Sequence, residues 1–450
     1  MIKRIIISFS AIIYVTLSIQ LAHAKGSGLS FIRDAEIEHT LRSYATPIFT
    51  AAGLNANDIS IHLVNNRTLN AFVAGGQRMF FFTGLLARVE HPDQLKGVIA
   101  HETGHIAGGH LARTQKALEN ATTKSIIGYI LGAAAIVAGG GQAGQAIILG
   151  SSGAAQKSFL KYNRAQESSA DQAAMKYLEQ AGVSGLGMLE FLGILGQSDL
   201  INYGKVDPYW RSHPISNERI AAIKNTVDKS AYRNVKESAR DIARLARLQG
   251  KLYGFTHTLA KTLKKYPDTD QTVEGRYARA IAYFRYPKLD LAKSEIDSLL
   301  SEFPRDPYFH ELKGQALYEN GEIFEALPSL EIAADYAPYE PLILTLYGTV
   351  LLSTDNPEDD KKAIKVLRSS IAYDPNNSNT WHQLAIAYSR AGDTGNLALS
   401  TAERFLLRGK MDKAIFHAKR AQDNLGAGSP GFLRADDIIT IASRLLKKRH

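Results

Sequence analysis

The chain has no cysteine in its 450 residues. This absence excludes disulfide bridges, thiolate metal ligands, a cysteine nucleophile and a lipid-modified cysteine near the amino terminus. If the chain is exported, the absence of cysteine is consistent with a bacterial periplasm. Any catalytic chemistry must therefore rest on other side chains.

A strong charge of one sign is also missing. The 53 basic and 44 acidic residues give a formal charge of +9, or +7 without the first 24 residues. The basic residues are scattered and form no nucleic-acid motif, so nucleic acid is not an expected partner. The mild excess favours anionic envelope surfaces, and the basic residues at the carboxyl terminus are expected to form a solvated tail.

The apolar run at the amino terminus is short for a membrane span. It covers residues 5–21, follows Lys3-Arg4 and ends before Ala22-His23-Ala24. This order predicts a signal peptide over residues 1–24 and a periplasmic mature protein. An uncleaved anchor is the alternative, because the 17 apolar residues lie near the lower limit for spanning.

Among the motifs that are present, His101-Glu102-Thr103-Gly104-His105 is the most informative. On a helix, this spacing puts both imidazoles on one face, where they can ligate one zinc ion, and leaves Glu102 able to act as a general base. Pro92 suits the first turn of such a helix. Because a five-residue pattern also occurs by chance, the prediction needs a third ligand.

A second predicted helix supplies that ligand. Glu167 and Asp171 are four residues apart and share one face. Glu167 is the candidate third ligand, and Asp171 is the candidate acceptor for the free ring N–H of a ligating histidine. The alternative for the two carboxylates alone is a solvated helix face.

These motifs together resemble metallopeptidase family 48, which includes the CAAX prenyl endopeptidases and HtpX-type membrane quality-control proteases. The similarity runs from about residue 33 to residue 223. It also includes an upstream strand region and a downstream motif, namely Asn70-Ala71-Phe72, residues 78–83, Ser212-His213-Pro214 and Arg219. The resemblance implies an α+β zincin-like domain, mostly helical with a small sheet, that binds one Zn²⁺ per chain and cleaves peptide bonds.

The same resemblance implies roles for His213 and Arg219. Both are candidate catalytic donors to the charge that develops on the substrate carbonyl oxygen. In relatives, the histidine matching His213 is thought to close the zinc site reversibly, which would make it a fourth ligand in a latent state. A plain turn residue before Pro214 is the alternative. His110 follows His105 by five positions where metzincins need six, so it is expected to be packed or hydrogen-bonded rather than a ligand.

Short strands are predicted upstream of the zinc motif. Ile59, Ile61 and Leu63 alternate with polar residues, and residues 71–73 and 79–82 form two further apolar segments around a glycine pair. The last segment is predicted at a sheet edge, where an extended substrate can pair with the backbone. The candidate substrate-binding residues are Asn70, Ala71, Phe72, Met79, Phe80 and Phe81, and burial in the core is the alternative for the apolar ones.

An apolar, glycine-rich insert covers residues 126–149. Neither half is long enough to cross a bilayer. A lid over the zinc site, a peripheral contact with the membrane or nascent substrate, and packed core are the alternatives.

The second half of the chain carries a repeat. Pro267, Pro304, Pro338 and Pro375 are separated by 37, 34 and 37 residues, which is the period of tetratricopeptide (TPR) repeats. Small and apolar residues recur within each unit, and the third unit has about three extra residues near Asp355 that would extend a turn. The sequence therefore predicts an all-α TPR solenoid, with a non-repeating bundle as the alternative.

The predicted organisation is a signal peptide (1–24), a zinc metallopeptidase domain (25–232), TPR repeats (233–425) and a carboxyl-terminal helix with a basic tail (426–450). An exported family-48 peptidase with a TPR tail resembles proteases that act in outer-membrane protein assembly. This resemblance implies unfolded or stalled outer-membrane proteins as clients and the barrel-assembly machinery as a partner of the repeat face. An adaptor with a latent zinc site and a general scavenging peptidase are the alternatives.

Overall fold

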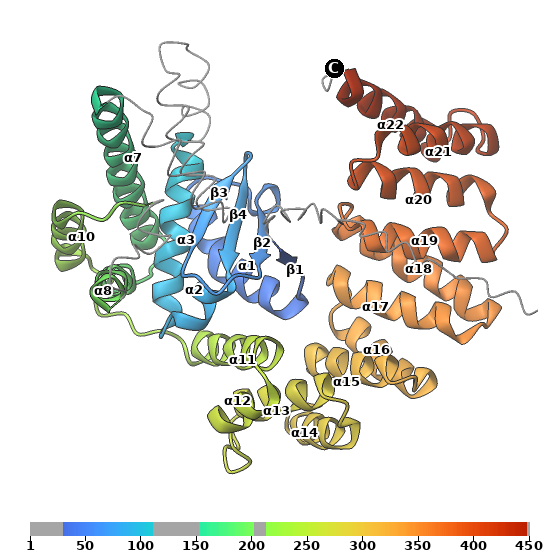
Figure 1. Cartoon of the computed structure of the whole chain (residues 1–450), viewed down its shortest axis with the longest axis horizontal. Helices are drawn as coiled ribbons and strands as arrows, with labels where there is room; N and C mark the ends of the chain where they lie inside the picture. The colour runs from blue at the N-terminus through green and yellow to red at the C-terminus, as the bar shows by residue number, and fades with distance from the viewer. Residues whose placement is uncertain (1–29, 111–152, 202–212, 448–450) are drawn as a thin grey trace, which may run out of the picture.

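The computed structural model describes residues 30–110, 153–201 and 213–447. An amino-terminal part combines a small sheet with helices, and an array of helical pairs follows it (Figure 1). The predicted fold class, an α+β domain followed by an all-α array, is confirmed. The signal peptide at residues 1–24, the apolar insert at residues 126–149 and the last three residues lie outside the described residues.

The sheet has four strands in the order β1-β2-β4-β3. The strands are β1 (Phe31–Ile32), β2 (Ser60–Val64), β3 (Ala71–Ala74) and β4 (Arg78–Phe82). β2 and β4 are parallel, whereas β1 and β3 lie antiparallel at the two edges. The tight turn between β3 and β4 uses Gly75 and Gly76, both of which have positive φ.

The predicted edge position of residues 79–82 is wrong. β4 lies between β2 and β3, and its residues from Met79 to Phe82 are all buried. Their unbroken apolar run is typical of a strand that is covered on both faces. On this side of the sheet the edge strand is β3, which begins directly after Asn70 and packs beside the helix that carries the zinc motif.

Within the described residues, six helices accompany the sheet. They are α1 (Ala35–Ala51), α2 (Thr83–Arg88), α3 (Pro92–Ala107), α7 (Gly153–Gln180), α8 (Leu186–Ile201) and α10 (Asn217–Lys229). Of these, α1, α2 and α3 pack on the strands of the sheet. α3 begins at Pro92 as predicted, and every residue from Pro92 to His105 is buried. It is the central helix of this part, with α7 and α8 packed against it (Figure 1).

Glycines allow the central helix to approach its neighbours closely. A Cβ atom on Gly104 would lie 2.7 Å from the Ala170 carbonyl oxygen of α7. A Cβ atom on Gly97 would lie 2.7 Å from the Cα atom of Met188 in α8. Because these contacts involve backbone atoms, any larger residue would push the neighbouring helix away. Gly104 therefore sets the distance between the zinc motif on α3 and the candidate ligand on α7.

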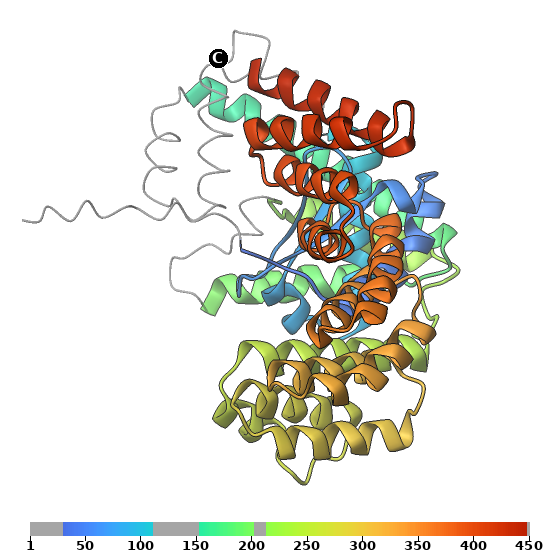
Figure 2. The same ribbon diagram turned by 90° about the vertical axis from the view of Figure 1, so that its right-hand side faces the viewer.

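The remaining helices form the array. Their bounds are α11 (Ala239–Thr256), α12 (Leu259–Lys265), α13 (Val273–Arg285), α14 (Leu289–Glu302), α15 (Pro307–Glu319), α16 (Ile323–Tyr336), α17 (Pro341–Leu351), α18 (Pro357–Tyr373), α19 (Ser378–Arg390), α20 (Thr394–Leu407), α21 (Met411–Asn424) and α22 (Pro430–Lys447). Successive helices pack in antiparallel pairs, and the array runs past one side of the amino-terminal part (Figure 2).

Close contacts within the pairs explain the repeat pattern. A Cβ atom on Gly314 would lie 2.4 Å from Leu330 Cγ, and one on Gly348 would lie 2.5 Å from Leu367 Cγ. Each glycine therefore makes room for a buried leucine of the partner helix. The extra residues of the third unit form a 3₁₀ turn at Leu352–Thr354, and Asp355 follows in the left-handed conformation. The extended turn predicted from the sequence is confirmed.

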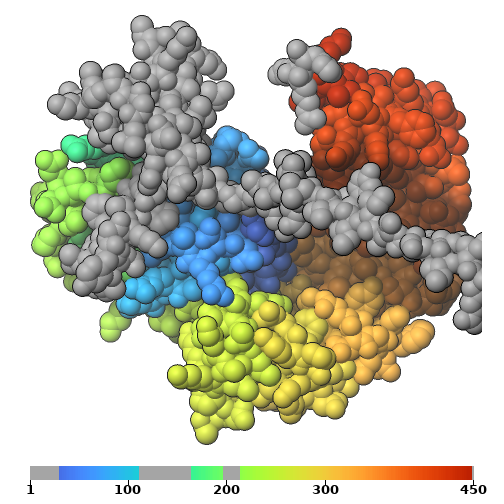
Figure 3. All heavy atoms as spheres, in the orientation of Figure 1, coloured from blue at the N-terminus to red at the C-terminus, as the bar shows by residue number. Residues whose placement is uncertain are grey.

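α11 joins the two parts of the molecule. Its Leu245, Leu248 and Leu252 belong to the same core as the sheet and α3, and the helix also packs on α13. The space-filling view shows the first helices of the array in contact with the amino-terminal part (Figure 3). The domain boundary between residues 232 and 233 stays a prediction. α11 follows this boundary but contacts helices of both the amino-terminal part and the array. Within the described residues, no helix has the length and hydrophobicity needed to cross a bilayer.

The contact at Gly104 generates a testable prediction. Gly104→Ala should lower stability by about 1–3 kcal/mol, because the added methyl group meets backbone atoms of α7 and the two helices must move apart. The displaced α7 should also weaken metal binding. Chemical denaturation and the measured zinc affinity of the full chain report the two effects.

Gly193→Ala is the matched control. Gly193 lies in α8, and its Cβ atom would have no neighbour within 4 Å. This change should stabilise the helix by about 0.5–1 kcal/mol and leave zinc affinity unchanged. Equal zinc affinity in the two variants would contradict the role given to Gly104.

Candidate metal centre

Two histidines of the zinc motif lie side by side on α3. His101 and His105 are 2% and 8% exposed, and their Nε2 atoms are 3.2 Å apart. The helical geometry brings them together, since residues four apart lie on one face. The structure thus places both rings toward one buried point.

Glu167 and His213 complete a cluster around that point. Glu167 on α7 has its carboxylate oxygens 3.3 Å from His101 Nε2 and 3.4 Å from His105 Nε2. His213, just before α10, has Nδ1 3.2 Å from both His101 Nε2 and Glu167 Oε2. One ligand atom from each of the four buried residues lies within 4.8 Å of all the others.

These spacings fit a tetrahedral divalent ion. With ligand bonds of about 2.0–2.1 Å, the ligand atoms around zinc lie about 3.3–3.4 Å apart. The contacts of 3.2–3.4 Å match this value, with one Glu167 oxygen near each histidine of α3, and the four ligand atoms together lie within 4.8 Å of one another. Nitrogen and oxygen donors of this kind are also ones that zinc prefers. The residue set therefore fits a divalent metal ion.

Asp171 and Arg219 support the cluster from behind. His101 Nδ1 donates to Asp171 Oδ1 at 2.9 Å, which leaves Nε2 free for an ion. Arg219 donates from Nε and Nη2 to the two Asp171 oxygens at 2.6 and 2.8 Å. Its Nη1 donates to the Pro214 carbonyl at 2.7 Å and lies 3.1 Å from Glu167. Arg219 thereby ties the segment containing His213 to α7.

His110 lies against the second ring of the zinc motif. Its Nδ1 is 2.9 Å from His105 Nδ1, on the side away from the cluster. This agrees with the prediction that His110 is hydrogen-bonded rather than a ligand. Both histidines of α3 therefore have a partner for the nitrogen that does not face the cluster.

Buried charges shape the titration of the cluster. Burial opposes charging of His101, but Asp171 and Glu167 together raise its pKa to about 10. Burial also opposes charging of Glu167, yet the His213 charge and the histidine hydrogen bonds hold the pKa of this carboxyl well below its usual value. For His105, burial dominates and lowers the pKa. The site therefore favours a positive charge between ionised carboxylates.

Glu102 lies beside the cluster. The side chain is fully buried, neither carboxylate oxygen has a hydrogen-bond partner among the described residues, and Oε1 is 3.4 Å from His213 Nε2. Leaving a buried carboxylate unsatisfied is costly unless a ligand or ion uses it. Its position suits a base that acts on a water molecule at the cluster.

The predicted substrate-binding residues are divided between two strands. Ala71 and Phe72 lie on edge strand β3. Asn70 precedes this strand, and its buried side-chain amide has no hydrogen-bond partner in the described part of the chain. Met79, Phe80 and Phe81 lie on interior strand β4, where their backbone pairs with β2 and β3. The available edge next to α3 is therefore that of β3.

Sequence reasoning missed two contacts of the site. The interaction of Arg219 with Asp171 joins residues 48 positions apart, so no local pattern predicts it. The role of Gly104 in helix packing could have been inferred from the sequence, because a glycine between two ligands on a helix permits a close approach of another helix.

Comparisons with known proteins agree with this geometry. Residues 32–227 match the model of peptidase family M48, and residues 366–396 match a tetratricopeptide repeat model. A beta-barrel assembly-enhancing protease of Yersinia pestis is 26% identical over 416 residues, covering 90% of this chain and 84% of that protein. The protein of the same name from Escherichia coli (strain K12) is 23% identical and covers 88% of this chain and 81% of its own length.

Among solved structures, the TPR protein YrrB, which has an unusual peptide-binding site, is 16% identical with a TM-score of 0.32. The match covers 42% of this chain and 96% of that one. The chain therefore combines a peptidase family M48 domain at residues 32–227 with tetratricopeptide repeats, and it is a metalloprotease.

Proposed function

We propose that the chain is a periplasmic zinc endopeptidase that acts in the assembly and quality control of outer-membrane β-barrel proteins. The observation that carries the catalytic part is the buried cluster of His101, His105 and Glu167 next to the fully buried carboxylate of Glu102. The names of the two enterobacterial relatives, which align along most of the chain, support the cellular part. The amino-terminal signal predicted from the sequence supports the periplasmic location.

In the proposed reaction, His101, His105 and Glu167 would hold one zinc ion, which would supply Lewis acidity toward water and the peptide carbonyl. Glu102 takes a proton from the attacking water molecule and delivers it to the leaving amine. Asp171 keeps His101 in the tautomer that presents Nε2 to the ion. An extended substrate segment pairs with edge strand β3, which favours unfolded chains over compact ones.

We assign Arg219 a positioning role rather than the catalytic role implied by family resemblance. Its three guanidinium nitrogen atoms are already directed at Asp171, Glu167 and the Pro214 carbonyl. A donor to the substrate carbonyl would have to leave these partners. The arginine instead fixes the carboxylate behind His101.

His213 supports a second state of the same enzyme. Its Nδ1 is as close to His101 and Glu167 as these ligands are to each other, which suits a fourth ligand. With His213 as the fourth ligand, the coordination position that water and substrate need would be occupied. We therefore propose a closed, latent state, and this observation also favours the alternative that the repeats act as an adaptor while cleavage is mostly shut off.

The repeat array is the proposed site for clients and for the barrel-assembly machinery. Its stacked helical pairs offer an extended surface of the kind that binds peptide segments or partner proteins. The general scavenging peptidase remains the alternative. It predicts cleavage of unfolded proteins without any association with the assembly machinery.

Glu102→Gln should abolish proteolysis while zinc binding remains. Loss of the general base is expected to lower the cleavage rate by about 10²–10⁴-fold, because the amide cannot accept the proton. The measurement is degradation of an unfolded outer-membrane barrel protein together with zinc stoichiometry. Glu218→Gln, at an exposed position of α10, is the control and should cleave normally. If Glu102→Gln restores barrel assembly in cells that lack the protein, the adaptor alternative gains and proteolysis is not required.

Arg219→Lys should weaken zinc binding without removing the base. A lysine cannot bridge both Asp171 oxygens and also reach Pro214, so His101 loses its fixed orientation. We expect a loss of zinc affinity of about 10- to 100-fold, with cleavage recovering at saturating zinc. A variant with normal zinc affinity but slow cleavage would instead support the catalytic role.

His213→Ala should speed proteolysis of an unfolded substrate. If about nine in ten molecules are closed at rest, removing the imidazole raises the rate about tenfold. The comparison is made at saturating zinc, so that loss of one ligand does not limit occupancy. An unchanged rate undermines the latent state, and a large decrease identifies His213 as a catalytic donor.

A further inference from the structure

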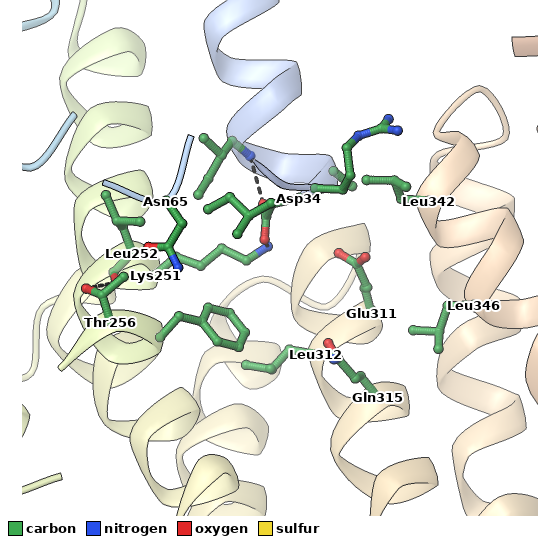
Figure 4. A pocket seen from close by; sticks show the side chains of 15 residues that line it. Asp34, Asn65, Lys251, Leu252, Thr256, Glu311, Leu312, Gln315, Leu342 and Leu346 are labelled. Atoms are coloured by element: carbon green, nitrogen blue, oxygen red, sulfur yellow. Dashed lines mark hydrogen bonds and ion pairs between the residues drawn. The ribbon is translucent and has the colours of Figure 1, made fainter. Parts of the chain in front are cut away.

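A cavity of about 440 Å³ lies at the junction of the peptidase part and the array (Figure 4). It is separate from the metal cluster and is bounded by the end of β1, the start of α1, and the helices α11, α15 and α17. A volume of this size accommodates a small ligand or a few residues of a peptide. Because both parts of the molecule line it, an occupant would contact both.

Most of the wall is apolar. The apolar lining residues include Ile37, Leu252, Phe255, Leu312, Leu342 and Leu346. Such a wall favours an aliphatic stem over a fully hydrated ion. A metal ion is disfavoured as well, because the cavity does not offer a cluster of nearby oxygen or nitrogen ligands.

The positive charges at the cavity already have partners. Lys251 Nζ lies 2.9 Å from Asp34 Oδ2 and 3.5 Å from Glu36 Oε2. Arg33 binds Glu38 and Asp374. These cations are therefore not available to bind an anionic ligand.

Glu311 is the charged lining residue without a partner. No hydrogen bond or ion pair joins its carboxylate to any described residue, and Figure 4 shows it extending from α15 among the other lining side chains. Burial raises its pKa to about 8, Lys251 opposes this rise, and the charges of Asp34, Glu36 and Glu340 add to it. A cation placed beside Glu311 would relieve both the burial of the carboxylate and its repulsion by these three acids.

We propose that this cavity binds an alkylammonium group, with the ammonium paired to the Glu311 carboxylate and the aliphatic stem against the leucines of α15 and α17. A lysine side chain of a bound peptide and a small free amine share this chemistry. An occupant touches the start of α1 as well as the repeats, so binding stabilises their arrangement. The inference does not depend on the metal centre.

The test uses the full chain with Glu102→Gln, so that no probe is cleaved. The probes are pentylamine and the tripeptide Leu-Lys-Leu, blocked at both ends, and pentanol is the uncharged control. Calorimetry should show binding of an ammonium probe at pH 8.5 and no binding of pentanol. Affinity should fall about tenfold or more from pH 8.5 to pH 6.5, because Glu311 takes up a proton in this range while the probes stay charged.

Glu311→Gln should weaken probe binding at pH 8.5 by at least tenfold and remove its pH dependence. Glu325→Gln, which removes an exposed carboxylate from α16, should bind like the parent chain. Tighter binding of the tripeptide than of pentylamine identifies a peptide as the source, and binding of pentylamine alone identifies a small amine. Failure of both probes to bind, or equal binding by Glu311→Gln, overturns the proposal.

Folding of the variant is checked separately. A carboxyl group with a raised pKa in the folded state loses stability as pH rises from its unfolded value toward about 8. Glu311→Gln removes this loss, so its melting temperature should equal that of the parent near pH 4.5 and exceed it increasingly up to pH 8. A variant that melts as predicted but still binds the probes rules out Glu311 as the ammonium partner.

Discussion

The close packing of α3 against α7 is the contact on which the peptidase site depends. α3 carries His101, Glu102 and His105, whereas Glu167 and Asp171 come from α7. Only a residue without a side chain at position 104 allows the two backbones to come this near, since its Cβ would lie 2.7 Å from the carbonyl oxygen of α7. The spacing of the ligand atoms is therefore a consequence of helix packing, and the chemistry of the site follows from it.

Charge balance explains why such a polar cluster can be buried. Glu102, Glu167 and Asp171 are almost completely buried, and Arg219 is the guanidinium that faces two of them. When the histidines are neutral, as metal ligands must be, three ionised carboxylates and one arginine leave two negative charges in a medium that penalises isolated charge. A divalent cation matches that deficit. The folded protein and its metal ion are thus expected to stabilise each other.

Local spacing predicted what a single helix determines. The pairing of His101 with His105 and of Glu167 with Asp171 follows from helical periodicity, and the repeat period predicted the helical pairs. Strand order was beyond such patterns, because an apolar segment such as residues 79–82 looks the same at an edge and in the interior of a sheet until its neighbours are known. The Arg219 contact and the cavity around Glu311 needed the tertiary arrangement of segments far apart in sequence.

The array is attached firmly at one end and loosely along its side. α11 buries Leu245 and Leu248 in the peptidase core, and its Arg247 binds both Glu36 of α1 and Asp306 at the start of α15. Farther along, Ala35 is buried against the array, His39 and Glu340 form a hydrogen bond, and Arg33 forms a half-exposed ion pair with Asp374 that contributes little by itself. Relative motion of the later repeats therefore costs less than motion of α11. The cavity at Glu311 lies between α11 and the contacts of Arg33 and His39, so the proposed occupant would bind where the two kinds of attachment meet.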